Sequence, residues 1–347
     1  MLGLLLFLAL MSRLPEVSPD NPAPLDEVKV DAATEISTLR TALDKQRGTG
    51  RPLRIVLSGF VSLKMPIRIG PNNAGVTLTS ATNRPATLTG SGGAQRGIEV
   101  IRSDHVVVDG LRLSGFSSDG LFVKDSKKIV VRNNVVTDTR STRWSQAAIH
   151  LTGSVSGSLV ANNTVAGADY DGILVDTTID SAITDVRISS NYVQDTCRKV
   201  PDCGAIHVND RARRSDGVII ERNQIAGFGP PATAGRGIYL DDWASHVLVR
   251  DNRIVGPGAF AFQIHGGHQN RLERNVVDMK AIREAVLYHP RRDGDWKDMN
   301  GNRIAFNRFD HGPAADRGLF GGRPVPAAAQ PLLIANRTCA RRCVALR

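Results

Sequence analysis

The chain has 347 residues, of which 41% are hydrophobic and 5% aromatic, and its 44 Lys and Arg outnumber its 34 Asp and Glu to give a net charge of +10. This composition supports a long core in a single elongated domain rather than in two compact ones. The positive charge favours a polyanionic partner. The basic residues are scattered and have no aromatic stacking platform beside them, which excludes nucleic acid as the expected partner.

Residues 1–11 form an apolar run, MLGLLLFLALM, that has the length of the hydrophobic part of an export signal and is too short to span a bilayer. We therefore expect residues 1–24 to be an export signal and linker, the protein to be periplasmic or secreted, and no stable membrane span. A misassigned start codon and an N-terminal anchor are the alternatives.

The next segments predict one strand and one helix. Apolar residues at 28 and 30 indicate the strand, and residues 32–46 are helical by pattern, with Ile36, Leu39 and Leu43 on one face and Asp31 placed to cap the start. Further strands are predicted at residues 55–59, 67–69 and 76–78. We expect the helix to cover the open sheet edge at the N-terminal end of the strands that follow.

A repeated pattern organises the chain from Gly120 onward. Its openings read GLFVKD, AIHLTG, GILVDT, AIHVND, GIYLDD, AFQIHG and AVLYHP, and each is followed downstream by an apolar strand with an asparagine: Asn134, Asn163, Asn191, Asn223, Asn252, Asn275 and Asn307. The asparagines recur every ~23 to 32 residues, which is typical of stacked repeats. We expect a left-handed backbone at each asparagine and amide hydrogen bonds between successive copies.

Each repeat is a coil of short strands that buries its apolar face only by stacking on its neighbours. From about Pro52 to Phe309 these repeats resemble the right-handed parallel β-helix of the pectate-lyase-like superfamily. The resemblance implies an all-β, right-handed parallel β-helix solenoid over residues 25–311, with an N-terminal capping helix and a tail, residues 312–347, packed on its end. This fold carries lyases, hydrolases, epimerases, phage tailspikes and adhesins, so the fold does not decide the reaction.

The four cysteines form two close pairs, Cys197 with Cys203 and Cys339 with Cys343. Local pairs behind an export signal favour two small-loop disulfides in an oxidising compartment. The alternative is a zinc site that uses all four cysteines, but the two pairs lie about 140 residues apart.

Alternate residues of the repeated strands form two outward columns, which we expect to face solvent because residues two apart point the same way. The first column is Phe122, His150, Leu174, His207, Tyr239 and Gln263, and the second is Lys124, Thr152, Asp176, Asn209, Asp241, His265 and His289. Three longer loops, residues 195–204, 227–236 and 291–300, are expected to wall this face.

Polar groups concentrate in the middle coils and predict a catalytic site there. With strands about 4.8 Å apart, Asp176 and Asp241 lie about 10 Å apart, slightly beyond an inverting pair, whereas Asp210 and Asp242 lie near retaining separation. Two close carboxylates have their pKa values pushed apart, which suits an acid and a base. We expect the catalytic residues among Asp241, the first choice, and Asp242, Asp210, Asp176, His207, His265 and Tyr239.

The remaining polar residues of these coils are assigned to substrate binding. They are His268, Arg213, Arg236, Lys124, Trp243 and Gln263, while Asp125, His150 and His289 are expected to line the groove. We expect no metal site. Calcium bound by Asp176, Asp210, Asp241 and Asp242 is the weaker alternative, because the interleaved histidines are poor calcium ligands.

These residues predict an exported enzyme, acting as a monomer, that cleaves glycosidic bonds in an acidic polysaccharide by carboxylate acid/base chemistry. The order Asn209-Asp210, Asp241-Asp242, His265-Gly266 resembles the Asn-Thr-Asp, Asp-Asp, Gly-His-Gly series of polygalacturonases, although the Asp pair here follows its strand. The first alternative is a uronan lyase or epimerase that uses His207, Tyr239 or His265 for proton transfer, with Arg213, Arg236 or Lys124 neutralising the carboxylate. The second is a non-catalytic glycan-binding surface solenoid.

Overall fold

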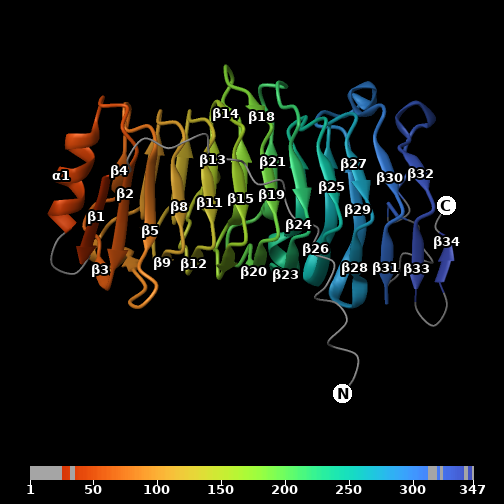
Figure 1. The fold of residues 1–347 in the computed structure, drawn as a ribbon. Helices are drawn as coiled ribbons and strands as arrows, with labels where there is room; N and C mark the ends of the chain where they lie inside the picture. The colour runs from red at the N-terminus through yellow and green to blue at the C-terminus, as the bar shows by residue number, and fades with distance from the viewer. Residues whose placement is uncertain (1–25, 32–35, 312–318, 321–322, 340–342, 346–347) are drawn as a thin grey trace, which may run out of the picture.

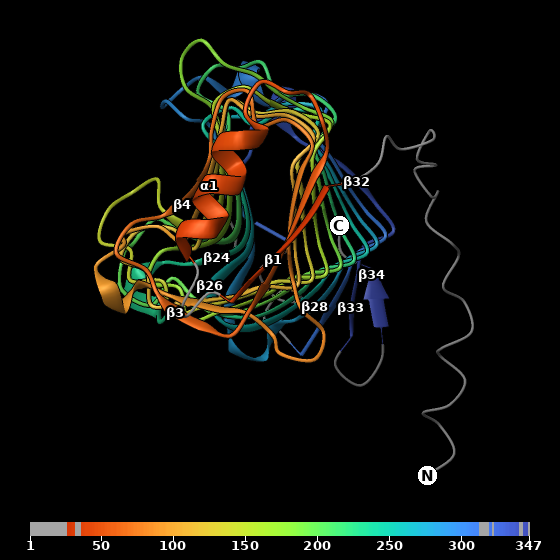
Figure 2. The same cartoon turned by 60° about the vertical axis from the view of Figure 1, so that its left-hand side comes forward.

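The computed structural model describes residues 26–31, 36–311, 319–320, 323–339 and 343–345. Short parallel strands stack along one axis into a β-helix (Figure 1), and the coils superimpose around a common core when the molecule is turned (Figure 2). The expected all-β parallel solenoid is confirmed, because residues with a period of two supply one inward face on every strand.

Three stacks of strands form the walls of this solenoid. The first is a 12-stranded sheet of β1 (Asp26–Asp31), β2 (Leu53–Ser58), β5 (Val76–Ser80), β8 (Val107–Asp109), β11 (Val130–Arg132), β15 (Leu159–Ala161), β19 (Arg187–Ser189), β22 (Ile219–Glu221), β25 (Leu248–Arg250), β27 (Arg271–Glu273), β30 (Arg303–Ala305) and β32 (Leu332–Ile334).

The second stack carries the repeat openings. It contains β4 (Ile67–Ile69), β7 (Ile98–Ile101), β10 (Leu121–Lys124), β13 (Ala147–Thr152), β17 (Asp171–Asp176), β21 (Gly204–Asn209), β24 (Arg236–Asp241), the end of β26 (Arg253–His265) and β29 (Ile282–His289).

The third stack follows the asparagines. It contains β3 (Phe60–Ser62), β6 (Thr87–Thr89), β9 (Arg112–Ser114), β12 (Val135–Thr137), β16 (Thr164–Ala166), β20 (Tyr192–Thr196), β23 (Gln224–Phe228), the start of β26, β28 (Val276–Asp278), β31 (Arg308–Asp310) and β33 (Arg337–Cys339). Two short strands, β14 (Val155–Ser156) and β18 (Ile183–Thr184), pair at a corner, and β34 (Cys343–Ala345) pairs antiparallel with β33.

Helix α1 (Ile36–Gln46) lies at the N-terminal end of the stack, as expected, and buries Leu39 and Leu43 (Figure 1). Asp31, which was expected to cap this helix, is the last residue of β1 and pairs with Arg84 at 2.6 Å. Residues 32–35, which join it to the helix, lie outside the described part of the chain, so the cap stays a prediction. Among the described residues, no helix has the length and hydrophobicity needed to cross a membrane.

An asparagine ladder runs along one corner of the solenoid. The side-chain amide of each member donates to the side-chain oxygen of the next at 2.9–3.0 Å, through Asn134, Asn163, Asn191, Asn223, Asn252, Asn275, Asn307 and Asn336. The expected amide bonding is confirmed, but the expected left-handed backbone at these asparagines is wrong. The positive φ lies one residue earlier, as at Asn133 and Asn162, because the ladder side chain must point inward, where its amide also reaches a carbonyl such as that of Val108.

Both predicted columns have the expected register in the second stack. Successive pairs join Phe122, His150, Leu174, His207, Tyr239 and Gln263 in one column, and Lys124, Thr152, Asp176, Asn209 and Asp241 in the other. The expectation that these columns face solvent is wrong for most of their members. His150 and His207 are each 3% exposed and Tyr239 is 1% exposed, because loops cover the middle coils.

The C-terminal segment extends the solenoid. Residues 332–334 and 337–339, which we expected in a tail packed across its end, form β32 and β33 and pair in parallel with β30 and β31. Cys197 and Cys203 form the expected disulfide. Cys339 is also disulfide-bonded and lies opposite Cys343 in the β33–β34 pair, although the side chain of Cys343 lies outside the described part of the chain. With Cys197 and Cys203 joined to each other, the four-cysteine zinc site is ruled out. The proposed export signal, residues 1–24, also lies outside the described residues.

Candidate functional site

A cavity of about 210 Å³ lies on the outward side of the second stack. Strands β17, β21 and β24 supply its floor, and the loops around them close it. Its lining residues are Trp144, Ser145, Tyr170, Leu174, Asp176, Asp202, His207, Asn209, Arg211, Asp241 and Arg291. The repeat therefore sets the spacing of the floor, while non-repeated loops decide how much of it is exposed.

His207 is held between two carboxylates on neighbouring coils. Its Nδ1 lies 2.9 Å from Oδ2 of Asp171, and its Nε2 lies 3.4 Å from Oδ2 of Asp241. Asp171 also accepts the backbone N–H of Gly204 at 2.7 Å, which fixes its position at the start of β17. Asp241 is then 2.6 Å from Nδ1 of His265, so a continuous row of Asp and His crosses four successive strands.

The same Asp–His–Asp arrangement occurs a second time, two coils earlier. Nδ1 of His150 lies 3.1 Å from Oδ1 of Asp119, and its Nε2 lies 3.0 Å from Oδ1 of Asp176. Asp119 accepts the backbone N–H of Ala147 at 2.9 Å, as Asp171 accepts that of Gly204. Arg96 binds the other oxygen of Asp119 at 2.7 Å. The two triads place Asp176 and Asp241, the last residue of each, in the same cavity wall.

The carboxylates fix the charge of both histidines. Burial opposes the imidazolium form of His207, but the negative charges of Asp171 and Asp241 outweigh it and raise the pKa of His207 to about 10. His150 is likewise buried, and Asp176 and Asp119 raise its pKa to about 10. These raised pKa values favour the imidazolium form of both side chains at neutral pH, although burial also raises the pKa of Asp171, the partner of His207. His207 is therefore suited to donate a proton.

The two cavity carboxylates are ionised. Burial works against the charge of Asp241, but the charge of His207 and the hydrogen bond and charge of His265 hold its pKa well below the usual range. Burial also opposes the charge of the half-buried Asp176, but His150 lowers its pKa. The Asp176 side chain is 15% exposed and that of Asp241 is 9% exposed. Two fixed negative charges thus flank the imidazolium of His207.

Two buried polar atoms at the cavity have no hydrogen-bond partner among the described residues. They are Nε2 of His207, whose 3.4 Å contact with Asp241 lacks hydrogen-bond geometry, and Oδ1 of Asn209. One is a donor and the other an acceptor, and both residues line the cavity. Buried polar groups are rarely left unsatisfied, and a hydroxyl, which donates and accepts, satisfies both.

Tyr239 and Asp202 complete one side of the site. The Tyr239 ring stacks on His207 with centroids 4.4 Å apart, and its hydroxyl donates to Oδ1 of Asp202 at 3.3 Å. Arg236 contacts the same oxygen at 3.0 Å, and the hydroxyl of Tyr170 donates to the Asp202 carbonyl at 2.9 Å. Burial raises the pKa of the Tyr239 phenol, so this group remains protonated and cannot act as a base.

Two arginine side chains bind the carboxylate of Asp242. Arg211 donates to its Oδ2 at 2.7 Å, and Arg291 binds its Oδ1. Carboxylate or imidazole atoms of Asp241, Asp242 and His265 lie within 4.8 Å of one another and have the geometry for a cation. The two guanidinium groups compete with any metal for Asp242, which makes this set a poor calcium site.

Asp210 does not line the cavity. Its carboxylate accepts the backbone N–H groups of Arg214 and Ser215 at 3.2 and 2.8 Å and the Thr177 hydroxyl at 3.2 Å, and so closes the turn after β21. We therefore do not include Asp210 in the catalytic set.

The residues assigned to substrate binding also lie outside the cavity lining. Gln263 is buried between Arg236 and His289, Arg213 stacks on Trp243 at 4.0 Å, and His268 lies against His246. Lys124 is exposed in an earlier coil. Of the six, Arg236 lies nearest the site, through its ion pair with Asp202.

Sequence reasoning missed Asp119, Asp171, Asp202, Arg211 and Arg291. The first two precede Gly120 and Gly172, at the start of alternate repeat openings, and this Asp-Gly pair was the available signal. The other three lie in loops that no repeat relates, and although the loops of Asp202 and Arg291 were expected to wall this face, no pattern singled out these residues within them. His150, expected only to line the groove, is the centre of the first triad.

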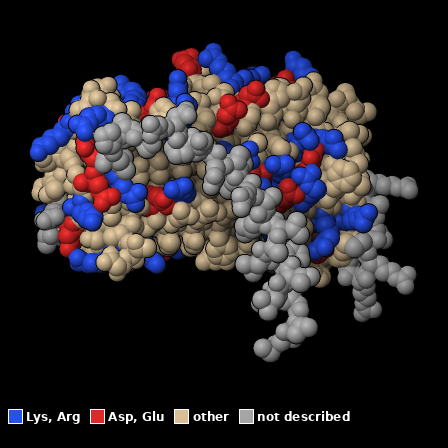
Figure 3. Space-filling view, in the orientation of Figure 1, with Lys and Arg blue, Asp and Glu red and all other residues tan. Residues whose placement is uncertain are grey.

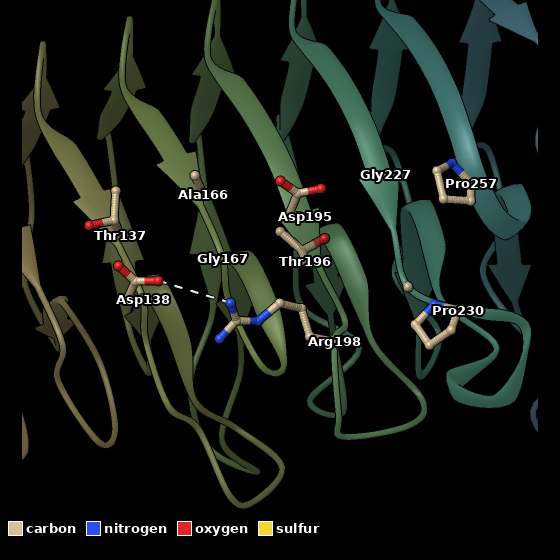
Figure 4. Close-up of a pocket in the computed structure, with 11 residues that line it drawn as sticks. Thr137, Asp138, Ala166, Gly167, Asp195, Thr196, Arg198, Gly227, Pro230 and Pro257 are labelled. Carbon is tan, nitrogen blue, oxygen red and sulfur yellow. Dashed lines mark ion pairs between the residues drawn. The ribbon is translucent and has the colours of Figure 1, made fainter.

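Another cavity, of about 500 Å³, lies where strands of the third stack end (Figure 4). Its lining includes Asp138, Asp195 and Arg198, with Arg198 and Asp138 3.9 Å apart. Turn residues such as Gly167 and Gly227 supply much of the rest. No residue predicted for the catalytic site lies in this cavity.

Comparisons with known proteins agree with the architecture. The profile of the protein family described as "Right handed beta helix region" matches residues 74–277. No curated protein matches the sequence. Among solved structures, a polygalacturonase from Erwinia carotovora ssp. carotovora superimposes with a TM-score of 0.58 at 12% identity, covering 97% of this chain and 99% of that one.

Two further structures are similar over most of the chain. An alginate lyase from Paenibacillus sp. str. FPU-7 gives a TM-score of 0.52 at 14% identity and covers 89% of this chain and 97% of its own. The pectate lyase Pel9A gives 0.51 at 12% identity, covering 92% and 78%. At such identities the likeness establishes the shared fold.

Proposed function

We propose, on the premise that this chain belongs to the family of right-handed β-helix proteins, that it is a polysaccharide-processing enzyme that hydrolyses glycosidic bonds in an acidic glycan. One observation carries the proposal: two ionised carboxylates, Asp176 and Asp241, border one cavity with the unpartnered Nε2 of His207 between them. The names of the similar structures, a polygalacturonase, an alginate lyase and a pectate lyase, support a glycan substrate.

The proposed reaction divides the roles among three side chains. Asp176, the more exposed carboxylate, removes a proton from water, whose oxygen forms the new bond to the anomeric carbon. The glycosidic C–O bond breaks as the leaving oxygen takes the proton from Nε2 of His207. Asp241 is already bonded to His265 and Asn209, and it stabilises the imidazolium and the positive charge that develops on the sugar ring.

Strand spacing places the proposed acid between the two carboxylates. Asp176 pairs with Asn209, which pairs with Asp241, so the two carboxylates lie two spacings, or about 10 Å, apart along the stack. His207 lies on the strand between them and pairs with Leu174, so the proposed base, Asp176, and the proposed acid, His207, lie on neighbouring strands.

The acidity of the substrate is proposed from the charges around the cavity. Arg211 and Arg291 line it, and each has guanidinium nitrogens beyond those that bind Asp242. Export is proposed from the Cys197–Cys203 disulfide, because such bonds persist in oxidising compartments.

The test is a panel of acidic and neutral polysaccharides assayed for new reducing ends. We expect cleavage of at least one acidic glycan and loss of that cleavage in Asp176→Asn and Asp241→Asn. Binding without turnover on the whole panel would instead support a glycan-binding solenoid.

A uronan lyase is the second candidate. The two cavity arginines favour it, because a lyase must neutralise the carboxylate next to the proton that it abstracts. The imidazolium state of His207 and the protonated Tyr239 argue against these residues as the base. An unsaturated, ultraviolet-absorbing product would identify elimination and replace hydrolysis as the assigned reaction.

A further inference from the structure

We propose that a second cavity, N-terminal to the catalytic one, binds an anionic sugar unit of the same polysaccharide; this inference rests on the proposed function. The cavity has a volume of about 640 Å³. It is lined by Lys64, Met65, Pro66, Arg68, Gly93, Ala94, Gln95, Arg96, Glu99, Ser117, Ser118, Thr142, Arg143 and Gln146.

This cavity has a surplus of positive charge. Four cationic side chains line it, against one carboxylate. That carboxylate, Glu99, is 5% exposed and is already bound by Arg68 at 2.7 Å and Arg96 at 3.3 Å. Lys64 and Arg143 are exposed and form no ion pair with any described residue. By contrast, Lys and Arg are interspersed with Asp and Glu over the face seen in Figure 3.

The two cavities are neighbours. The loop between β12 and β13 contributes Thr142, Arg143 and Gln146 to the basic cavity and Trp144 and Ser145 to the catalytic one. Arg96 is also connected to Asp176 of the catalytic cavity through Asp119 and His150. Because one loop lines both cavities, an extended ligand that follows this loop can contact both.

The register gives the separation of the two sites. Glu99 pairs with Phe122, Phe122 with His150 and His150 with Leu174, so three strand spacings, about 14 Å, separate Glu99 from the level of Asp176. A single sugar unit at Asp176 therefore cannot also reach Glu99. The occupant is therefore an oligomer or polymer that runs along the solenoid axis.

The side chains around the cations favour a glycan over a nucleic acid. Hydroxyl and amide groups of Gln95, Ser117, Ser118, Thr142 and Gln146 suit the hydroxyls of a sugar. None of the described residues that line the cavity is aromatic, whereas single-stranded nucleic acids are bound by stacking on aromatic side chains.

The experiment measures binding apart from turnover. Polygalacturonate, alginate and dextran sulfate are titrated by calorimetry at low salt, with neutral dextran and single-stranded DNA as comparisons. The double variant Lys64→Glu with Arg143→Glu removes the unpaired cations. The matched control, Lys127→Glu with Lys128→Glu, changes the net charge equally at two exposed lysines between β10 and β11.

We expect the wild type to bind one of the acidic glycans more tightly than dextran or DNA, the first variant to lose affinity at least about tenfold, and the control to change by less than about twofold. An equal loss of affinity in the Lys64/Arg143 variant and in the Lys127/Lys128 control would overturn the proposed site, since the change in net charge alone would explain it. Tighter binding of DNA would overturn the glycan assignment. If only the Lys64/Arg143 variant loses affinity and the protein cleaves no glycan, the proposed binding site stands and only the proposed hydrolysis is rejected.

Discussion

Nδ1 of His207 lies 2.9 Å from Oδ2 of Asp171, and this contact favours the charged form of His207, which lines the catalytic cavity. Asp171 is fully buried and does not itself line the cavity. Its effect on a substrate therefore passes through His207, whose other nitrogen faces the cavity without a partner. Asp171 is a positioning residue, and Asp241 supplies the second negative charge.

The charge of His207 predicts the alkaline limit of activity. If His207 donates the proton, kcat/KM stays high at neutral pH and falls as the pH approaches about 10, the raised pKa of His207. Asp171→Asn removes the first of the two charges that raise this pKa, so the alkaline limb should move to lower pH by about one unit or more. The measurement is a pH profile of kcat/KM for both proteins, and coinciding alkaline limbs would exclude His207 as the donor.

The cavity carboxylates predict a second result. Asp176→Asn and Asp241→Asn should each lower kcat/KM by roughly 10²–10⁴, because an amide neither removes a proton from water nor stabilises positive charge. Asp210→Asn is the control, since Asp210 closes a turn outside the cavity. Its kcat should remain within about threefold of wild type while its melting temperature falls. Equal loss of kcat in all three variants would indicate that folding, not chemistry, is affected.

The repeat made much of this site predictable. A period of two within strands and a repeat of short coils placed Asp176, Asn209 and Asp241 in one column, and the structure has that register. Burial was not predictable in the same way, because it depends on the loops that carry Trp144 and Arg291, and neither loop belongs to the repeat. The sequence therefore indicated which side chains share a wall but not that the wall is covered.

The pairing of histidines with aspartates was hidden for a related reason. Asp119 and Asp171 lie immediately before Gly120 and Gly172, the first residues of their repeat openings, and so outside the alternating columns. Each reaches a histidine on the next coil, so the contact joins two different positions of the repeat. Comparing only the equivalent positions of successive repeats finds the columns but misses contacts between different positions, such as those of Asp119 and Asp171 with their histidines.

The first triad predicts a pH-dependent contribution to stability. His150 lies between the buried Asp119 and the half-buried Asp176, and removing it takes the paired cation from Asp176 and leaves Asp119 with Arg96 alone. His150→Leu should therefore lower the free energy of unfolding by roughly 3–5 kcal/mol at pH 6. Because the folded pKa of His150 is raised to about 10, its contribution is fully present below the unfolded value near 6.5 and is lost as the pH rises towards 10.

Urea denaturation of the wild type and of His150→Leu at several pH values measures the contribution of His150 to the free energy of unfolding. Lys124→Leu is the control, since Lys124 is an exposed member of the neighbouring column and forms no ion pair with a described residue. Its effect should be small and independent of pH between 6 and 10. A difference between wild type and His150→Leu that stays constant over this range would show that the charge of His150 does not contribute to stability.

The disulfide predicts a change in substrate binding. Cys197 and Cys203 close the loop that holds Asp202 against Arg236 and Tyr239 at the cavity wall. Replacing both cysteines with serine frees this loop and should cost about 2 kcal/mol of stability, as expected for a short closed loop. Because Asp202 lines the cavity but has no proposed part in bond cleavage, KM should rise several-fold while kcat changes little.

Steady-state kinetics of the double serine variant, measured well below its melting temperature, tests this expectation. Asp202→Asn is the matched comparison, since it weakens the same contacts and leaves the disulfide intact. If KM rises in both variants, the weaker substrate binding of the double serine variant is explained by the displaced Asp202. A loss of kcat at constant KM in either variant would instead assign Asp202 a role in the chemical step, since only an interaction made in the transition state changes kcat alone.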